Sequence, residues 1–424
     1  MTDALNHETL IGDTRELAEP VHYPRFFSEA PCRTSDVTEV LRAFCKVPPK
    51  SLILRVYQDG GNFSSEQARV LASPPADGES LASWWQRMWR KKPTALVLNG
   101  VERFHEGLCR RVAALLRPLL AARGIPVGGI DIALFIGDYG YTPFGVHADP
   151  DPAFLIPVGS AVKTLSVWSP SVFRKSAGTR DVSFDLATLL PEAQSFALAE
   201  GSLFFLPAGH FHIGRNDGLS VTMTVSLGEV SRRALAKKAL RAVLERSLLT
   251  LPATDLAFGD CAPSNQRLID EAVALVEGAA AAGTTAADWL RAGADAYCLS
   301  MLSNGGFRLS PLERQEPAVS LRGRTIAGAA PFQIKYQLLG DGRMALFVRG
   351  ACVTIKANPE LPAVIDRINE GRLLGVSEIV TALGRRWTEG ATLHVLALMS
   401  NLGGIEAVGS AQLTPSVEVA DARC

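Results

Sequence analysis

A histidine and an aspartate one residue apart, His147 and Asp149 in the stretch FGVHADPDP, have types and spacing that could bind a metal ion. On a β-strand alternate side chains point to the same face, so these two groups would converge. In a loop, Asp149 would instead cap a turn before Pro150, and His147 would lie on the surface. The pair alone leaves both interpretations open.

Two further candidate ligands, His210 and His212, follow an apolar run that ends LFFLP. Two histidines and one carboxylate on one face of an octahedral metal leave three positions open, which is how non-haem Fe(II) oxygenases hold a co-substrate and O2. A structural zinc site would be closed by a fourth protein ligand. The seven cysteines contain no C-x-x-C pair, so the histidines are the place to look for a metal.

The elements that must position these residues lie between about 130 and 228. Four short apolar runs separated by turn residues occur there: IDIALFIG, KTLSVWSP, GSLFFLPAG and LSVTMTVSLG. Such even spacing predicts a β-sandwich or barrel. In SVTMTVS the apolar residues alternate with Ser and Thr, so one face of that strand is polar, as suits a barrel that holds a ligand.

The N-terminal hundred residues predict a strand in SLILRVYQ, a helix in ESLASWWQRMWRKKP and a strand in TALVLNG. The three tryptophans at helical spacing indicate a buried helix face. A long amphipathic helix is predicted in GLCRRVAALLRPLLAARG, ended by Gly124. We take 1–228 as one domain.

Residues 229–310 predict helices, and the apolar stripe of the stretch 231–250 suits packing against a second copy of the chain, which predicts a homodimer. Residues 311–424 predict a linker, a hairpin, helices and a short strand, an order that resembles a winged helix. The last predicted helix, GATLHVLALMSNLG, contains no Lys or Arg and so lacks the charge that supplies most DNA affinity.

Composition excludes several classes of partner. The chain has 43 Lys and Arg against 43 Asp and Glu, so no global field attracts nucleic acid or an anionic membrane. The first residues are polar and acidic, unlike a secretion signal, and no run of about 18 uncharged apolar residues follows. These features predict a cytoplasmic protein without nucleic-acid or membrane partners.

The runs IGDYGYTPFGVHAD, KTLSVWSP, GSLFFLPAGHFHIG and LSVTMTVSLG together resemble the JmjC-type cupin core of Fe(II)- and 2-oxoglutarate-dependent oxygenases. They are similar in particular to ribosomal-protein hydroxylases and to the asparaginyl hydroxylase that inhibits hypoxia-inducible factor. The resemblance implies a double-stranded β-helix, or jelly roll. In that family H-x-D supplies two metal ligands, and a histidine five residues after a strand-ending proline supplies the third. Pro207 plus five is His212, so the resemblance favours His212 over His210.

The family also has a basic residue 13 or 14 positions after the metal carboxylate, which pairs with the distal carboxylate of 2-oxoglutarate. Lys163 lies 14 positions after Asp149. Judged on its surroundings alone, a lysine among the apolar neighbours in PVGSAVKTLSVW is costly unless an anion compensates it. The alternative is a lysine at a strand edge that reaches solvent.

Thr142 resembles the family's threonine that helps to hold the co-substrate, although two extra residues separate it from His147. Tyr139 and Tyr141, just before the first ligand, and Arg215, just after the last, are candidate substrate contacts. Each is equally typical of a structural role, because tyrosines before a turn commonly pack and an arginine after one is commonly solvated.

The resemblance therefore implies an Fe(II)- and 2-oxoglutarate-dependent dioxygenase that uses O2 to hydroxylate a side chain of a peptide or protein, releasing succinate and CO2. Two alternatives stay open: a hydroxylase of a free small molecule, and a non-catalytic metal-binding cupin. Ribosomal relatives commonly have H-x-D-x-x-D-V-F, whereas this chain has HADPDPAFLIP, so its substrate is expected to differ.

Overall fold

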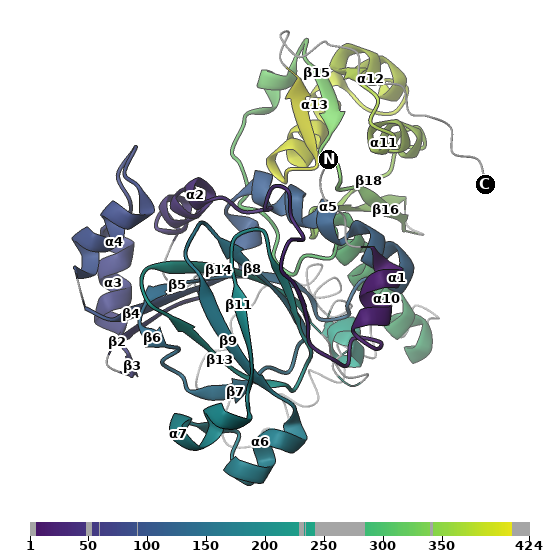
Figure 1. Cartoon of the computed structure of the whole chain (residues 1–424). Helices are drawn as coiled ribbons and strands as arrows, with labels where there is room; N and C mark the ends of the chain where they lie inside the picture. Colours follow the sequence, from purple (N-terminus) through teal and green to yellow (C-terminus); the bar gives the residue numbers. More distant parts are fainter. Residues whose placement is uncertain are drawn as a thin grey trace, which may run out of the picture.

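The computed structural model describes residues 6–47, 53–58, 60–90, 92–228, 233, 235–241, 285–339 and 342–408. Its centre is a jelly roll of two antiparallel sheets (Figure 1). The major sheet has the strand order β1-β12-β8-β14-β5-β4-β2-β3, and the minor sheet has the order β10-β7-β13-β9-β11, with β6 paired to β13. This arrangement confirms the predicted mainly β core.

The strands of the major sheet are β1 (Val21–Tyr23), β2 (Leu54–Gln58), β3 (Gly61–Asn62), β4 (Thr94–Asn99), β5 (Gly129–Asp138), β8 (Ala153–Val158), β12 (Leu203–Leu206) and β14 (Ser220–Gly228). Those of the minor sheet are β6 (Gly140–Tyr141), β7 (Val146–Ala148), β9 (Lys163–Trp168), β10 (Val182–Ser183), β11 (Gln194–Leu198) and β13 (Phe211–Asn216).

The largest hydrophobic core lies between the outer face of the major sheet and the N-terminal helices. These helices are α1 (His7–Asp13), α2 (Thr34–Phe44), α3 (Ser64–Ala72), α4 (Leu81–Trp89) and α5 (Glu106–Arg123). The three tryptophans of α4 are buried in this core, and α5 ends at Gly124, as the sequence predicts. In β14, Met223 enters the core while Thr222 and Thr224 face the other way, between the sheets.

The outer face of the minor sheet carries a smaller core under α6 (Pro170–Ala177) and α7 (Leu186–Leu189). There the rings of Phe173 and Phe211 stack with centroids 3.6 Å apart. This packing supports β13 from outside, so its inward residues are held against the space between the sheets.

The C-terminal module has its own hydrophobic core and two three-stranded sheets, β19-β15-β20 and β16-β17-β18. Its helices and strands, together with the preceding α10, are α10 (Ala286–Ser303), β15 (Thr325–Gly328), β16 (Lys335–Leu338), β17 (Arg343–Val348), β18 (Ala351–Lys356), α11 (Leu361–Asn369), β19 (Leu374–Gly375), α12 (Val376–Leu383), α13 (Glu389–Asn401) and β20 (Ile405–Val408). Three short 3-10 helices complete the described elements: Val101–Arg103, Leu190–Glu192 and Ala318–Leu321.

The predicted hairpin, helices and final strand are present in the C-terminal module, and α13 packs its apolar residues inside it. The predicted domain boundaries stay predictions. Most of the stretch 231–250 lies outside the described residues, so the predicted dimer contact is not tested either. Within the described part, no helix has the length and apolar character needed to cross a bilayer.

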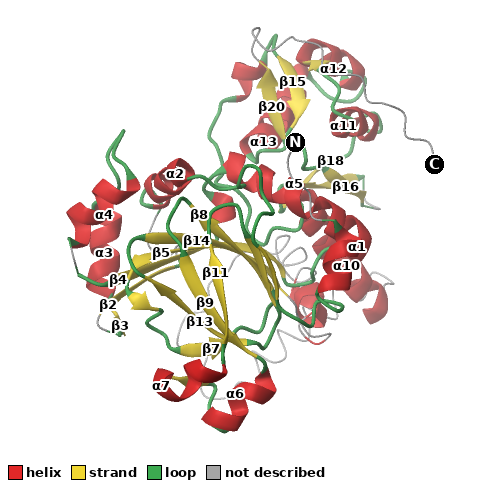
Figure 2. Ribbon diagram, viewed as in Figure 1, coloured by secondary structure: helices red, strands yellow, loops and turns green. Residues whose placement is uncertain are grey.

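Arg349 joins the C-terminal module to the jelly roll, and Figure 2 shows α5 between the two. The Arg349 side chain is 1% exposed; its Nη1 lies 2.7 Å from Oε1 of Glu106 on α5, and its guanidinium lies 3.5 Å from the centroid of the Phe332 ring. Its Nε donates to Asn304, and Arg110 of α5 pairs with Glu406 of β20. These contacts bind α5 to the module at two points.

Candidate metal centre

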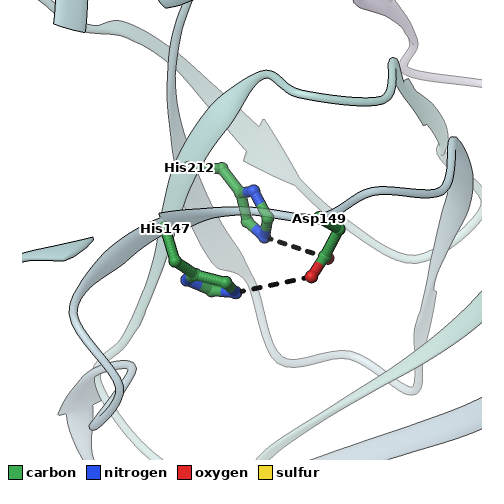
Figure 3. A group of neighbouring side chains, drawn as sticks. All are labelled: His147, Asp149 and His212. Atoms are coloured by element: carbon green, nitrogen blue, oxygen red, sulfur yellow. Dashed lines mark ion pairs between the residues drawn. The ribbon is translucent and has the colours of Figure 1, made fainter. Parts of the chain in front are cut away.

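His147 and His212 are brought together by sheet register. They lie directly opposite each other in the antiparallel pair formed by β7 and β13. Asp149 is the first residue after β7. Because side chains alternate between the two faces of an extended chain, the Asp149 side chain lies on the same face as that of His147. Figure 3 shows the three side chains pointing toward one another.

The three groups offer one ligand atom each, all within 4.8 Å of one another. Nε2 of His147 lies 3.9 Å from Oδ1 of Asp149, and Nε2 of His212 lies 3.7 Å from Oδ2 of the same carboxylate. A single ion placed between these atoms would be within reach of all three after small side-chain movements.

The hydrogen bonds of the two imidazoles fix which nitrogen is available. Nδ1 of His147 lies 3.0 Å from the carbonyl of Gly145, and Nδ1 of His212 lies 3.3 Å from the carbonyl of His210. A carbonyl only accepts, so each Nδ1 carries the proton and each Nε2 presents a lone pair to the centre. This is the usual way in which a protein orients a histidine ligand.

Burial keeps His212 neutral. Desolvation, reinforced by the neighbouring His147 and opposed by Asp149, lowers the pKa of His212 to about 4. A neutral imidazole is the form that binds a metal. Burial also lowers the pKa of His210, whose Nδ1 is buried without a hydrogen-bond partner, but His210 is not among the three groups that converge.

A cavity of about 230 Å³ opens beside the three ligands, between the two sheets. Lys163, on the first residue of β9, lines this cavity and is 6% exposed, so it does not reach solvent as a strand-edge lysine would. Its Nζ lies 5.8 Å from the centroid of the Phe135 ring. No acidic side chain in the described ranges forms an ion pair with Lys163, and a buried ammonium without a carboxylate is costly unless an anion enters.

Thr142 also lines the cavity, but both functions of its hydroxyl are already used by β13. Its Oγ1 accepts from the amide of Gly214 at 2.8 Å and donates to the carbonyl of Gly214 at 2.9 Å. A Cβ added to Gly214 would lie 2.4 Å from Cε of Lys163, so the absence of a side chain at Gly214 makes room for the lysine. Thr142 therefore holds the strand against which Lys163 lies.

The three candidate substrate residues lie outside the cavity lining. Arg215 is half exposed, pairs with Asp217 at 2.9 Å, and has its guanidinium 5.8 Å from the centroid of the Tyr141 ring. The amide of Tyr139 donates to Asn216, and its ring lies against Gly137. These three residues therefore pack against one another and their neighbours in the sheet, and none of them lines the cavity.

Arg55, Tyr57 and Phe144 line the cavity but were not singled out from the sequence, whereas Thr222 lies on the polar face predicted for SVTMTVS. Phe144 lies against His147, with ring centroids 4.9 Å apart, and Thr222 Oγ1 is buried with no hydrogen-bond partner in the described structure. A signal was present for Arg55, a single charge within the apolar run SLILRVYQ. The pairing that brings β2 to the cavity could not be inferred from that run.

No protein-family model and no curated protein matches the sequence. Among solved structures, the chain is similar to the ribosomal oxygenase YcfD from Escherichia coli, with a TM-score of 0.50, 16% identity, and coverage of 96% of this chain and 99% of that chain. A structure of YcfD with cobalt and 2-oxoglutarate gives a TM-score of 0.51 at 16% identity, over 96% of this chain and 99% of that one. The likeness extends over nearly the whole chain and supports the mainly antiparallel β, cupin-like core that the sequence resemblance implies. The winged-helix-like form of the C-terminal module stays a prediction.

Proposed function

We propose that the protein is an Fe(II)- and 2-oxoglutarate-dependent dioxygenase. The observation that carries this proposal is the meeting, at one cavity, of the facial group His147, Asp149 and His212 with the buried, uncompensated Lys163. The first set suits a metal that keeps open positions, and the second suits a co-substrate with a remote negative charge. The cobalt and 2-oxoglutarate named for YcfD support the same assignment.

In this proposal His147, Asp149 and His212 hold the metal, and Lys163 pairs with the distal carboxylate of 2-oxoglutarate. The free hydroxyl of Thr222 lies across the cavity from the minor sheet and donates to the same carboxylate, which satisfies its buried oxygen. Thr142 acts through Gly214, because its hydroxyl is already hydrogen bonded there. Tyr139, Tyr141 and Arg215 are then supports of the site or outer contacts of a large substrate.

Bound iron, with 2-oxoglutarate and O2, supplies the oxidising power that inserts one oxygen atom into a C–H bond while 2-oxoglutarate becomes succinate and CO2. The protein's own residues supply position. The β7–β13 ladder sets the spacing of the two imidazoles, and the buried cation of Lys163 fixes the far end of the co-substrate.

We propose a side chain of a peptide or protein as the substrate. Support comes from the name of YcfD as a ribosomal oxygenase and from a likeness that extends through the C-terminal module. The sequence HADPDPAFLIP, with two prolines after the metal pair, favours a target other than the ribosomal one. The module itself we propose to be winged-helix-like, without a DNA-binding role, because α13 is apolar and packed inward.

We also propose a homodimer formed through the stretch 231–250. The residues described within it, 233 and 235–241, are helical, and Leu240 is 44% exposed, as expected of an apolar stripe that packs against a partner. Light scattering of the full chain at micromolar concentration tests this, since a monomer would contradict it.

Turnover of 2-oxoglutarate tests the main proposal. The purified chain, given Fe(II), ascorbate, O2 and 2-oxoglutarate, should form succinate, and peptides recovered from cells that contain the protein should include one that is heavier by one oxygen atom than in cells without it. Asp149→Ala is the control, because it removes a ligand from an exposed position without touching the core. Succinate formation by Asp149→Ala at the wild-type rate would refute the metal assignment.

A further inference from the structure

Arg55 faces the same cavity as the metal ligands but comes from a different side. Along β2 burial alternates, with Leu54 and Val56 in the core and Arg55 and Tyr57 turned toward the cavity. The Tyr57 ring lies 5.5 Å from that of Phe144, which in turn lies 4.9 Å from that of His147. The cavity-facing side of β2 is thus linked to the metal centre through one intervening ring.

The guanidinium of Arg55 is held but not neutralised. Its Nη2 donates to Oδ1 of Asn99 at 2.9 Å, while its Nε is buried with no hydrogen-bond partner. Within the ranges that the structure describes, no carboxylate pairs with Arg55. A charged donor that lines a cavity in this state lacks the anion that such a group normally meets.

The tether explains why the head of Arg55 stays in place. Asn99 donates through Nδ2 to Oδ2 of Asp131 at 3.2 Å, which turns its Oδ1 toward Arg55. The charge of Asp131 is in turn taken by Arg308, at 2.8 Å. Asp131, the carboxylate that Asn99 contacts, is therefore already paired with Arg308. Asn99 orients Arg55 but supplies no negative charge to it.

Arg55 enters the cavity from a different part of the sheet than Lys163. Arg55 pairs in register with Val97 of β4, and Val97 pairs with Phe135 of β5. At about 4.8 Å per strand, Arg55 starts roughly 10 Å across the sheet from Phe135, the ring beside Lys163. The two cations therefore reach the cavity from backbone positions that lie apart.

The charge balance of the cavity indicates which kind of group binds to Arg55. The bound divalent ion, Lys163 and Arg55 together carry four positive charges, and Asp149 carries one negative charge, which leaves a net charge of plus three. The 2-oxoglutarate dianion reduces this net charge to plus one. One positive charge remains, and it is that of Arg55. We propose that Arg55 selects a substrate that carries a carboxylate close to the C–H bond that is oxidised. This inference rests on the proposed function and deepens it.

The carboxylate could belong to an Asp or Glu side chain of a peptide or to a free small acid, and two binding measurements separate these sources. The full chain, loaded with Fe(II) and 2-oxoglutarate without O2, is immobilised and used to capture peptides from a library degenerate at every position. In parallel, calorimetry compares free aspartate and glutamate with asparagine and glutamine. Arg55→Met and Arg55→Lys are tested beside the control Arg174→Met, which removes a half-exposed guanidinium from α6.

We expect the wild type to prefer acids over their amides by about 10- to 100-fold in one of the two measurements, as for the loss of one charge-assisted hydrogen bond. Arg55→Met should abolish the preference, Arg55→Lys should retain part of it, and Arg174→Met should keep it. The inference would be overturned if the wild type preferred amides or bases, or showed no preference in either measurement. It would also be overturned if the preference for acids persisted in Arg55→Met.

Two further results would distinguish a failure of this inference from a failure of the proposed function. If Arg55→Met weakened 2-oxoglutarate binding and left the acid preference intact, Arg55 would belong to the co-substrate and the inference would be wrong. If the wild type formed succinate but showed no acid preference, the oxygenase assignment would stand while the role of Arg55 fell.

Discussion

Replacing Lys163 tests the link between a buried charge and co-substrate binding most directly. In Lys163→Met the apolar length of the side chain is retained and only the ammonium is lost, so the packing against Phe135 and Gly214 is disturbed little. We expect 2-oxoglutarate binding to weaken strongly while metal binding changes little, because the lysine contacts no metal ligand through a hydrogen bond or ion pair in the described structure.

The size of the effect follows from burial. Lys163 is 6% exposed, so solvent screens its charge weakly. Removing one member of such a desolvated pair costs ~2–5 kcal/mol. At about 1.4 kcal/mol per factor of ten, the dissociation constant for 2-oxoglutarate should rise roughly 30-fold to several thousand-fold.

Anaerobic calorimetry of the Fe(II)-loaded protein measures this constant without turnover, and a separate Fe(II) titration provides the control. Lys163→Arg should recover part of the affinity, because a guanidinium can pair with the same carboxylate, although Gly214 leaves little space for its larger head. An unchanged 2-oxoglutarate titration in Lys163→Met would refute the reasoning, and the co-substrate would then have to be anchored elsewhere, with Thr222 the next candidate.

Three other predictions follow from neighbouring features. Gly214→Ala should fold but weaken 2-oxoglutarate binding with Lys163 still present, since the new Cβ would lie 2.4 Å from Cε of the lysine and displace its flexible end; unchanged binding would contradict this. His212→Ala should lose Fe(II) affinity and His210→Ala should keep most of it, because only His212 converges with His147 and Asp149; metal titration showing the reverse order would exchange their roles. Burial, reinforced by Asp131, raises the pKa of Glu102 to about 8, so between about pH 4.5 and 8 the folded state keeps a proton that the unfolded state releases, and stability should fall by up to ~1.4 kcal/mol per pH unit across that window. Glu102→Gln should flatten this slope in urea unfolding at several pH values, and an equal slope in both proteins would exclude the effect.

Local patterns in the sequence predict the parts of the site that lie on single strands. The two-residue spacing of His147 and Asp149 and the alternating hydroxyls of SVTMTVS are read directly from the chain, and the structure places Thr222 and Thr224 on the cavity face. Lys163 is singled out by the spacing from Asp149 that the family resemblance implies, and its apolar neighbours support that choice. The structure adds burial, which excludes the alternative of a solvent-reaching lysine at a strand edge.

Pairings between distant segments could not be predicted in this way. β1 pairs with β12 and β2 with β4, but short-range periodicity does not specify which strands become neighbours. Arg55 therefore looked like one charge in an ordinary strand until the sheet order turned its face toward the metal centre. The role of Thr142 also depended on a partner distant in sequence, Gly214 of β13.

The burial of Arg349 has a consequence for how the molecule comes apart. Removal of the C-terminal module would leave Glu106 of α5 without that counter-charge and would strip Phe307, a core residue, of its contact with Phe332. If the module separated from the jelly roll in the intact chain, the guanidinium of Arg349, which now packs against the Phe332 ring, would become exposed to solvent. Each half therefore melts less readily while the other is attached, so the two cores should lose their structure in a single cooperative step. A fragment ending near residue 310 would be a destabilised protein rather than a minimal enzyme.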